Sequence, residues 1–515
     1  MSRLVLIIVI PLVATACTLG PRYKRPEVQT PAAFRGADAA ADPGAGSLAD
    51  VEWSALFSDP ALTEIVTRAL KQNFDVRMAA ERVLQARALY RVARSDQFPT
   101  VGASVGAVTS GTSREGVTPV PEGADRDVSY TEAGFSLSWE LDVWGRLRRL
   151  TEASRARYFA TEEARKAIVT TLIGDVMETY LSLRSLDLEL EIARRTGTVA
   201  EEGLRLTRAR QERGVATALD VRQAEQLLYL ARGRIAGAER AIAQTENALS
   251  LLLGQHPGEI TRGRTIEALS VPPSVPAGLP STLLERRPDI RQAEQELIAA
   301  NAQIGAAKAE YFPRISLTGF LGVQSRSLSD LLTGGAGLWS AGLGAAAPIF
   351  NAGKTGANVR YAEAVQRELV VNYQRAIYSA LREVADALAG YRKTADQRAE
   401  QERLVEALDA SVRLSRQRYE GGIDNYLQVL DAQRGLFQGE LELARLRQQE
   451  LASIVQLYRA LGGGWNKTTA AVVNANSGTE ELGNWGSQRA CERMCGFRLQ
   501  PEEFPDLPPE GGSHP

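Results

Sequence analysis

The sequence is poor in the residues that most often carry out catalysis or hold metal ions. Its 515 residues include two histidines, three cysteines and four methionines. His256 lies beside a proline and His514 lies near the C-terminus, so neither is placed as in a catalytic triad or a histidine-based metal site. No glycine pattern of a nucleotide-binding loop is present. We therefore expect a protein that is not an enzyme, with no catalytic residue, no metal site and no bound cofactor.

The chain also lacks an excess of charge of one sign, and its N-terminal apolar run is short. The 60 Lys and Arg are balanced by 62 Asp and Glu, whereas nucleic-acid-binding proteins usually carry a clear basic excess. The apolar run, residues 4–14, is shorter than the about 20 residues that a membrane-spanning helix requires. The first absence excludes nucleic acid as a partner, and the second excludes a helical anchor at this position.

The N-terminus has the pattern of a secretory signal peptide. Arg3 precedes the apolar run, and three small residues lead to Cys17, which predicts removal of residues 1–16. Small residues followed by cysteine resemble the lipobox of bacterial lipoproteins, in which the cysteine receives a diacylglycerol. Cys17 is therefore the predicted lipidation site, since two or three acyl chains anchor a protein far more firmly than one. The alternative is an ordinary signal peptide with an incidental cysteine.

The residues after Cys17 indicate where the lipid would lie. Thr18 stands where an Asp would retain such a lipoprotein in the inner membrane. We expect a lipid-anchored protein of the outer membrane of a Gram-negative bacterium, with outer membrane lipid as a partner and a large periplasmic portion. Residues 17–50 contain a stretch rich in Ala, Gly, Pro and Asp, which predicts an extended, lipidated tether that runs away from the lipid.

The rest of the chain contains one architecture twice. Residues 75–99 and 289–313 both begin with Asp, an aliphatic residue and Arg, both end on Phe-Pro, and align without a gap. This match predicts two homologous halves rather than unrelated domains. We place the first repeat at 51–256, a connection at 257–280 and the second repeat at 281–465, followed by a tail at 466–515 that is predicted to be disordered.

Long helices are predicted in both repeats. Proline is excluded from helix interiors. It is absent from residues 122–256 and from residues 349–500, whereas several prolines cluster at 257–288 between these two tracts. Helical tracts are expected at 152–213 and 219–252. In the second repeat, steps of three and four residues follow a mostly apolar heptad track, which comprises Leu427, Leu430, Arg434, Phe437, Leu441, Ala444, Gln448, Leu451, Val455 and Tyr458.

Between each Phe-Pro and the next long helix the apolar period changes from helical to alternating. Alternation of apolar with small or polar residues is typical of a strand with one apolar face. Two strands are expected in each repeat, joined by exposed loops at 109–129 and 324–338. The apolar positions are Val101, Ala103, Val105, Ala107, Phe135, Leu137, Trp139, Leu141, Ile315, Leu317, Ala341, Leu343, Ala345 and Ala347.

Four strands are too few if their apolar face meets lipid. Hydrocarbon cannot satisfy free sheet edges, and bacterial barrels need at least about eight strands. Three copies would supply twelve strands, enough to enclose an aqueous lumen. The predicted fold is therefore an α+β membrane channel, in which long antiparallel coiled-coil helices form a periplasmic α-barrel and four strands per chain join a trimeric 12-stranded β-barrel. A solitary α+β domain, with its sheet covered by helices, is the alternative.

Three separated motifs resemble a known family. They are "CTLGPRYKRP" at 17–26, "LPSTLLERRPDIRQAE" at 279–294 and "YEGGIDNYLQVLDAQR" at 419–434, and they are similar to the outer membrane factors of tripartite export pumps, the TolC-like family, in its NodT/OprM-type lipoprotein branch. The resemblance implies a homotrimeric channel. It also implies a periplasmic membrane-fusion adaptor and an inner-membrane efflux transporter, of the RND type or similar, as partners.

The same resemblance assigns roles to residues at the tips of the helical hairpins. Gly214 and Gly422 align as tip positions against the adaptor, and glycine suits a turn between two rods. The periplasmic aperture would be formed by Asp220, Tyr419, Asp424, Leu427 and Asp431. Carboxylates related by threefold symmetry repel one another and favour cations. The alternative for Asp220 and Asp424 is that they simply favour the turn or the first helical turn.

The expected function is to conduct small toxic compounds, such as drugs, solvents or metal ions, passively out of the cell. A type I protein-secretion channel of the same architecture and a non-porous periplasmic coiled-coil scaffold lipoprotein remain as alternatives. Methionine and histidine are too scarce to indicate a metal-relay lining. In the tail, Cys491 and Cys495 lie four residues apart, a spacing compatible with a disulfide or with half of a metal site.

Overall fold

The computed structural model describes residues 18–36, 47–113, 115–117, 123–269 and 280–475. The signal peptide, Cys17 and the two tail cysteines lie outside these residues, so their predicted roles stay predictions. The chain divides after Asn466 into two compact units, which are described separately.

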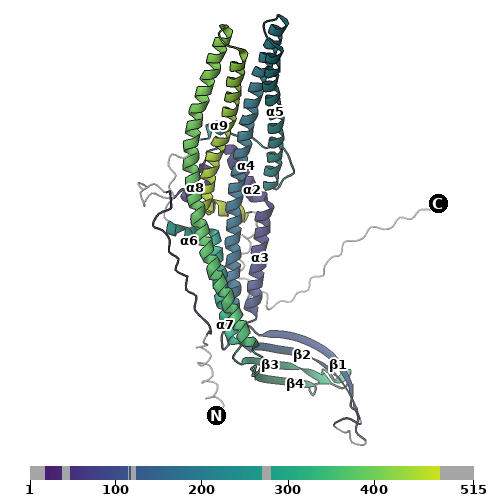
Figure 1. Ribbon diagram of the computed structural model, residues 1–515. Coiled ribbons are helices and arrows are strands. Elements are labelled where there is room, and N and C mark those ends of the chain that lie inside the picture. Colours follow the sequence, from purple (N-terminus) through teal and green to yellow (C-terminus); the bar gives the residue numbers. More distant parts are fainter. Residues whose placement is uncertain (1–17, 37–46, 114, 118–122, 270–279, 476–515) are drawn as a thin grey trace, which may run out of the picture. The chain divides into compact units, whose positions relative to one another are not determined.

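The first unit contains both repeats (Figure 1). Each repeat runs through a short helix, a medium helix, two strands, a very long helix and a long return helix. The first comprises α2 Pro60–Gln72, α3 Phe74–Ser95, β1 Thr100–Gly111, β2 Asp127–Leu141, α4 Arg146–Glu212 and α5 Ala218–Leu252. The second comprises α6 Leu283–Arg286, α7 Pro288–Ala309, β3 Arg314–Ser325, β4 Gly337–Ala346, α8 Lys354–Glu420 and α9 Tyr426–Ala460.

The duplication is evident in the lengths of the elements. Helices α4 and α8 both have 67 residues, α5 and α9 both have 35, and α3 and α7 both have 22. A helix of 67 residues is about 100 Å long at about 1.5 Å per residue. The predicted long helices and the internal repeat are therefore confirmed.

The start of α4 differs from the prediction, because it lies at Arg146 rather than at residue 152. The carboxylate of Asp142 accepts hydrogen bonds from the backbone N–H groups of Leu147 (3.0 Å) and Arg148 (2.9 Å). These donors have no partner inside a helix, so the carboxylate extends α4 back almost to the end of β2. Of the helices that the structure describes, none is both long and apolar enough to cross a bilayer.

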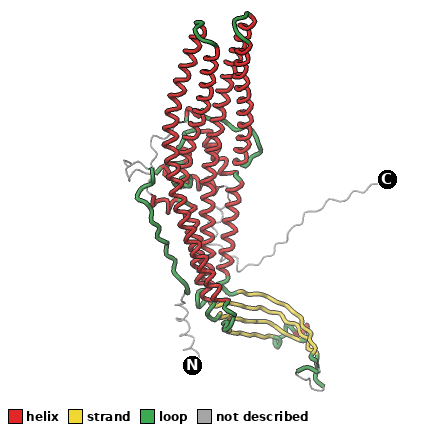
Figure 2. The backbone as a smooth tube through the Cα atoms, in the orientation of Figure 1, coloured by secondary structure: helices red, strands yellow, loops and turns green. Residues whose placement is uncertain are grey.

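The helices of the two repeats pack side by side (Figure 2). Helix α4 packs against α2, α3, α5, α7 and α9, whereas α8 packs against α6, α7 and α9. Where α4 meets α7, the contact is made by small side chains, including Ala153 and Ala156 on α4 and Ala299 and Ala302 on α7. On α9 the predicted heptad track is buried from Leu430 onward, apart from Arg434 and Gln448, while Leu427 at its start is 43% exposed.

The four strands form one antiparallel sheet in the order β1-β2-β3-β4, as predicted. The strands extend further than expected, so the loops shrink to 112–126 and 326–336. Residues that face each other across the sheet share a side of it, and the register places Val101, Leu137 and Gly319 in one row and Ala103, Phe135, Leu321 and Trp339 in the next.

One side of the sheet is therefore apolar and the other side is rich in serine, threonine and glycine. On the polar side, Gly102, Ser136 and Ser340 share a row in which Phe320 is the exception. The apolar side is not covered: Phe135 is 61% exposed and Trp339 is 77% exposed. The sheet extends beyond the end of the helices (Figure 1). The alternative of a sheet covered by helices is wrong for this chain.

The N-terminal segment is extended, as predicted, but its described part is also docked on the helices. The N–H of Leu19 donates to the carbonyl of Trp144, at the end of β2 (3.2 Å). Further along, Arg25 pairs with the buried Glu294 of α7 through two bonds of 2.7 Å. Composition alone does not reveal this docking, because its partners lie far away in the sequence.

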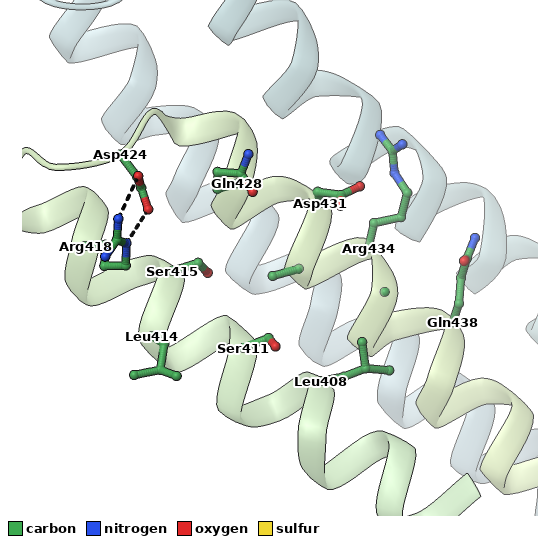
Figure 3. Close-up of a pocket in the computed structure, with 12 residues that line it drawn as sticks. Leu408, Ser411, Leu414, Ser415, Arg418, Asp424, Gln428, Asp431, Arg434 and Gln438 are labelled. Atoms are coloured by element: carbon green, nitrogen blue, oxygen red, sulfur yellow. Dashed lines mark hydrogen bonds and ion pairs between the residues drawn. The ribbon is translucent and has the colours of Figure 1, made fainter.

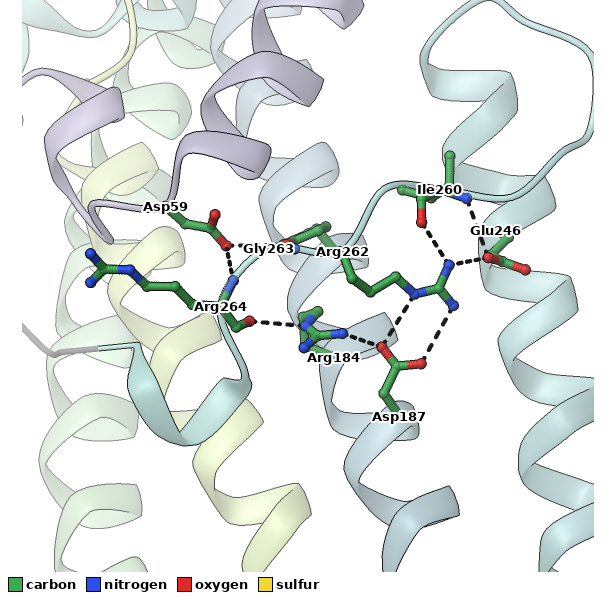
Figure 4. Close-up of polar contacts among 9 residues, drawn as sticks. Asp59, Arg184, Asp187, Glu246, Ile260, Arg262, Gly263 and Arg264 are labelled. Carbon is green, nitrogen blue, oxygen red and sulfur yellow. Dashed lines mark hydrogen bonds and ion pairs between the residues drawn. The ribbon is translucent and has the colours of Figure 1, made fainter.

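The connection between the repeats is held against α4 by a polar network (Figure 4). Asp59 is buried, accepts the hydroxyl of Tyr180 (3.0 Å) and accepts the N–H of Arg264 (3.3 Å). Arg262 pairs with Asp187 of α4 (3.4 Å) and with Glu246 of α5. The network fixes the return of the chain from α5.

The second unit begins with a helix, α10 Lys467–Ala475. The prediction of a disordered tail from residue 466 is wrong for these nine residues. They contain neither proline nor glycine, so nothing in their sequence interrupts a helix.

Candidate functional site

The first hairpin tip, residues 213–217, turns α4 into α5 through a glycine. Gly214 has φ +76°, a conformation that suits glycine because it has no Cβ. Its N–H donates to the carbonyl of Gln211 (2.8 Å), and the N–H of Val215 donates to the carbonyl of Arg210 (2.9 Å). This pair of bonds is the Schellman motif, which satisfies carbonyls at a helix end.

The second hairpin tip, residues 421–425, repeats this geometry between α8 and α9. Gly422 has φ +73°, its N–H donates to the carbonyl of Tyr419 (3.0 Å), and the N–H of Ile423 donates to the carbonyl of Arg418 (2.9 Å). The prediction that Gly214 and Gly422 lie where one helix turns into the next is confirmed. Their contact with an adaptor stays a prediction.

Both tips expose apolar side chains at matching positions. Val215 and Leu219 are each 65% exposed at the first tip, and Ile423 is 68% and Leu427 43% exposed at the second. Isolated exposed apolar residues are common on proteins. The same pair at two equivalent tips is a repeated apolar surface, which is typical of a binding site.

Asp220 is occupied with its own turn. Its carboxylate accepts the backbone N–H and the hydroxyl of Thr217 (2.7 and 2.8 Å), and its N–H donates to the Thr217 hydroxyl oxygen (3.2 Å). This reciprocal arrangement is the capping box of α5. These contacts agree with the alternative prediction for Asp220, namely that it favours the start of a helix.

Asp424 instead pairs with an arginine across the second tip (Figure 3). Arg418 of α8 donates Nε–H to Asp424 Oδ2 at 2.5 Å and Nη2–H to Oδ1 at 3.3 Å. These hydrogen bonds from Arg418 lower the pKa of Asp424 from its usual value. The second tip is therefore closed by an ion pair where the first is closed by a capping box.

Tyr419 lies between the two hairpins. Its ring packs against that of Tyr426 with 5.1 Å between centroids and 47° between the ring planes, and the guanidinium carbon of Arg210 lies 4.7 Å from its ring centre. Cations are attracted to the face of an aromatic ring. Tyr419 thus links α8 with α4 and α9, which agrees with a role in closing the aperture without testing it.

Tyr426, which the sequence did not single out, is the larger contributor to this contact. It is 9% exposed and belongs to an apolar cluster shared by α4, α5 and α9 that includes Leu204, Leu227 and Leu430. A Cβ on Gly203 of α4 would lie 2.5 Å from its hydroxyl oxygen. An isolated glycine inside a helical pattern often marks such a close approach, so Gly203 was the available signal.

A groove of about 510 Å³ separates α8 from α9 below the second tip. Gln428 and Asp431 of α9 and Asp424 of the second tip line it (Figure 3). Asp431 is exposed, and its carboxylate makes no hydrogen bond or ion pair with any residue that the structure describes. The structure therefore brings Asp424 and Asp431 to one groove, while Asp220 lies on the other hairpin and Tyr419 and Leu427 lie outside the groove.

Further from the tips, the two hairpins are joined by a buried carboxylate that sequence reasoning missed. Glu189 of α4 is 4% exposed and pairs with Arg445 of α9 (3.3 Å) and with Arg234 of α5. A buried charge needs such partners. Nothing in the local sequence marks Glu189, because its partners come from other helices.

Within the described residues, no group of three or more His, Cys, Asp and Glu side chains could hold a metal ion. The candidate site thus consists of two helical tips with exposed apolar side chains, the contacts that hold the tips, and a groove lined by Asp424, Asp431, Arg418 and Arg434. The model of the family described as outer membrane efflux protein matches residues 65–255 and 279–463, which is most of both repeats. The chain belongs to this family.

Named relatives agree with the family assignment. The solvent efflux pump outer membrane protein SrpC of Pseudomonas putida is 41% identical over 459 residues, which cover 88% of this chain and 97% of that protein. The cation efflux system protein CusC of Escherichia coli O6:H1 is 35% identical over 457 residues, with the same coverage of 88% and 97%. The relatives thus include proteins named for two different kinds of cargo.

Solved structures agree as well. The open state of the Neisseria gonorrhoeae MtrE outer membrane channel has a TM-score of 0.79 and 31% identity, covering 87% of this chain and 98% of that one. This outer membrane efflux protein is accordingly an outer membrane channel component of an efflux pump, as the sequence predicted. These relatives support neither the protein-secretion channel nor the scaffold without a pore.

Proposed function

We propose that three copies of this outer membrane efflux protein form one channel that releases small organic toxic compounds. The observation that carries the proposal is a sheet with one exposed apolar side and two free edges, β1 and β4. In lipid, unpaired backbone groups at a sheet edge are too costly to persist. Pairing β4 of one copy with β1 of the next removes every free edge and gives a twelve-stranded barrel.

The helices at the two sides of the protomer support the same assembly. Helix α3 exposes Leu89 (66%) and Val92 (59%), while α8 exposes Tyr361 (73%) and Tyr378 (59%). These two helices follow from the sheet edges, α3 leading into β1 and α8 continuing from β4. Contact between α8 of one copy and α3 of the next would bury both surfaces and continue the barrel as a helical tunnel.

The polar side of the sheet would then line the lumen. Its serine, threonine and glycine residues offer a wide aqueous path and no specific binding site, which suits passive conduction. Energy would come from an inner-membrane transporter, joined to the channel by a periplasmic adaptor that covers Val215, Leu219 and Ile423 at the tips. Burial of these apolar side chains would stabilise the contact.

The aperture would close where three second hairpins meet. In that arrangement Asp431 and Leu427 face the axis, Arg418 is retained by Asp424, and Tyr419 holds the second hairpin against the first. Three Asp431 carboxylates around a narrow lumen would favour cations over anions. Opening requires the contacts of Tyr419 and Tyr426 with α4 to loosen.

A lipid on Cys17 would anchor each copy. Leu19, two residues after Cys17, is held between β2 and α4 by its bond to Trp144. A further relative, from Salmonella typhimurium, is named probable outer membrane lipoprotein SilC and is 36% identical over 458 residues. Both observations favour an anchor at the membrane surface beside the barrel.

The cargo proposal follows the relatives named for solvent and toluene efflux, each 41% identical over 459 residues. The second candidate is a cation, after CusC. Four methionines and two histidines provide few of the soft ligands that would pass such ions along a lining. We therefore expect organic compounds.

Two measurements test this function. Detergent-extracted protein should migrate as an SDS-resistant trimer and conduct ions in planar bilayers; a monomer whose residues 135–141 exchange freely with water would overturn the channel proposal. Expression in a strain that lacks its own outer membrane efflux proteins should raise survival in toluene more than survival in copper or silver. Protection against the metal ions alone would overturn the cargo assignment and leave the channel intact.

A further inference from the structure

Close to the sheet, α3 and α4 leave a cleft of about 550 Å³ between them. Two arginines, Arg94 of α3 and Arg155 of α4, line this cleft together with the rings of Tyr90, Tyr158 and Phe159. It lies far from the tips, in the first repeat only, and none of the roles assigned above uses it.

The cleft has positive charge and no negative charge of its own. The guanidinium of Arg94 makes no hydrogen bond or ion pair with the residues that the structure describes, and the guanidinium of Arg155 lies over the ring of Phe159, 5.4 Å from its centre. No carboxylate lines the cleft. The nearby carboxylate of Glu162 accepts the hydroxyl of Tyr158 and does not reach the cleft lining.

At the equivalent place, the second repeat has an ion pair that the first repeat lacks. By the alignment of the repeats, Arg94 corresponds to Lys308 of α7, and Arg155 corresponds to Glu363 of α8. In the second repeat these residues form an ion pair, with Lys308 Nζ 3.1 Å from Glu363 Oε1. The first repeat carries an arginine in place of that glutamate. Two facing cations without a carboxylate repel each other, so the geometry calls for an anion from outside the chain.

The position of the cleft indicates where this anion comes from. Gln97, which also lines the cleft, accepts on its carbonyl the indole N–H of Trp139 (3.0 Å). Trp139 lies on the apolar side of the sheet, in register with Leu317, and the neighbouring Phe98 is 58% exposed. The cleft therefore opens at the end of the apolar surface, where aromatic rings and arginines typically meet lipid headgroups.

We propose that the cleft between α3 and α4 binds the phosphate of an anionic membrane lipid. Arg94 and Arg155 donate hydrogen bonds to the phosphate oxygens, a pairing for which guanidinium groups are well suited. The rings of Tyr90, Tyr158 and Phe159 contact the glycerol region, and the acyl chains run along the apolar side of the sheet. This assignment rests on the proposed function in one respect, because it requires that side of the sheet to face lipid.

Native mass spectrometry of the full chain in detergent, with lipid added, tests the site. Phosphatidylglycerol should remain bound more strongly than the zwitterionic phosphatidylcholine. Arg155→Glu restores the carboxylate that the second repeat has and should leave the fold intact, but it should weaken retention of phosphatidylglycerol by about tenfold or more. Arg94→Gln combined with Arg155→Gln should have a similar effect. The matched control is Lys308→Gln, which breaks the pair in the second repeat and should leave retention unchanged.

Each arm has an outcome that overturns the site. Equal retention of phosphatidylglycerol by the wild type, Arg155→Glu and the double variant would remove the cleft as the binding site. Equal binding of both lipids, or binding of inorganic phosphate as tightly as of phosphatidylglycerol, would exclude a lipid headgroup. Dissociation of the trimer by Arg155→Glu, with no dependence on lipid, would assign the two arginines to a subunit contact instead.

The trimer mass and the bilayer conductance, recorded on the same samples, report on the proposed function separately. A conducting trimer that binds neither lipid overturns only the lipid site. A chain that stays monomeric and does not conduct overturns the channel itself.

Discussion

At the base of its hairpin, each repeat fixes the last carbonyl of its return helix, but the two repeats use different side chains. In the first, the side-chain amide of Asn73 donates to the carbonyl of Leu252 at the end of α5 (2.9 Å). In the second, Arg287 Nη1 donates to the carbonyl of Ala460 at the end of α9 (2.9 Å). The duplicated backbone therefore leaves an equivalent carbonyl unpaired at the end of each return helix. An asparagine donates to this carbonyl in the first repeat and an arginine donates to it in the second.

The long helices differ in a second way, through their neighbours. Helix α4 packs against five other α-helices and α8 against three. Glu189 of α4 is consequently buried, whereas Gln397, which occupies the same position of α8, is exposed. The comparison shows that the stabilising contacts of a duplicated helix depend on which elements surround it in the protomer. Helix α8 has fewer neighbours, so one of its sides remains free for a neighbouring copy.

The largest effect on stability is expected where α4 and α8 differ, at the buried Glu189 of α4. Glu189→Ala leaves two arginines, Arg234 and Arg445, without their shared carboxylate, which should lower the free energy of unfolding by about 3–5 kcal/mol. Gln397→Ala, the matched control, should change it by less than about 0.5 kcal/mol. Urea unfolding of the detergent-solubilised protein measures both. Equal effects would show that the two helices are equivalent in the protein.

Substitutions at the two hairpin bases should differ less in their effect on the free energy of unfolding. Arg287 is 8% exposed and also pairs with Asp289 and Glu383 (2.7 and 2.8 Å), so Arg287→Ala should cost about 2–3 kcal/mol. Asn73→Ala removes a helix cap and one hydrogen bond, which should cost about 1–2 kcal/mol. The same urea unfolding ranks the two variants. A larger loss for Asn73→Ala would mean that the ion pairs of Arg287 contribute nothing.

The tips should differ in their response to acid. Because the pKa of Asp424 is lowered by Arg418, its pair stabilises the second tip above the unfolded-state pKa of about 4. That contribution is lost as the pH falls through the lower pKa of the folded state. Single-channel currents of the closed wild type should therefore rise at acid pH. Asp424→Asn should show the raised current already at neutral pH and no further step; a wild-type step retained in Asp424→Asn would contradict this assignment.

The smallest effect on stability is expected at Asp431, which the first repeat replaces by Gln223. Asp431→Ala should change the free energy of unfolding by less than about 0.5 kcal/mol, because the side chain is exposed. It should nevertheless lower the preference of the closed trimer for cations, measured as the reversal potential in a salt gradient. Gln223→Ala, the control, should leave the reversal potential unchanged. Currents that do not respond to Asp431→Ala would remove it from the aperture.

Much of the fold could be predicted because its signals are local. Proline-free tracts and heptad spacing marked α4, α5 and α9, alternation marked all four strands, and two glycines marked the tips. The site was less accessible. Asp220 and Asp424 looked alike in sequence, yet one caps its own helix and the other pairs with an arginine. Tyr426 and Glu189 went unnoticed, because their importance depends on residues of other helices.

The sequence by itself determined the repeat, the presence of the long helices and of the four strands, and the turns at Gly214 and Gly422, since their signals are patterns of residues close together in the chain. The tertiary structure decided which of two equally long helices is buried, which carboxylate finds an arginine, and where Arg94 and Arg155 face each other without a counter-charge. Those outcomes depend on distances between residues far apart in the chain, and only packing sets such distances.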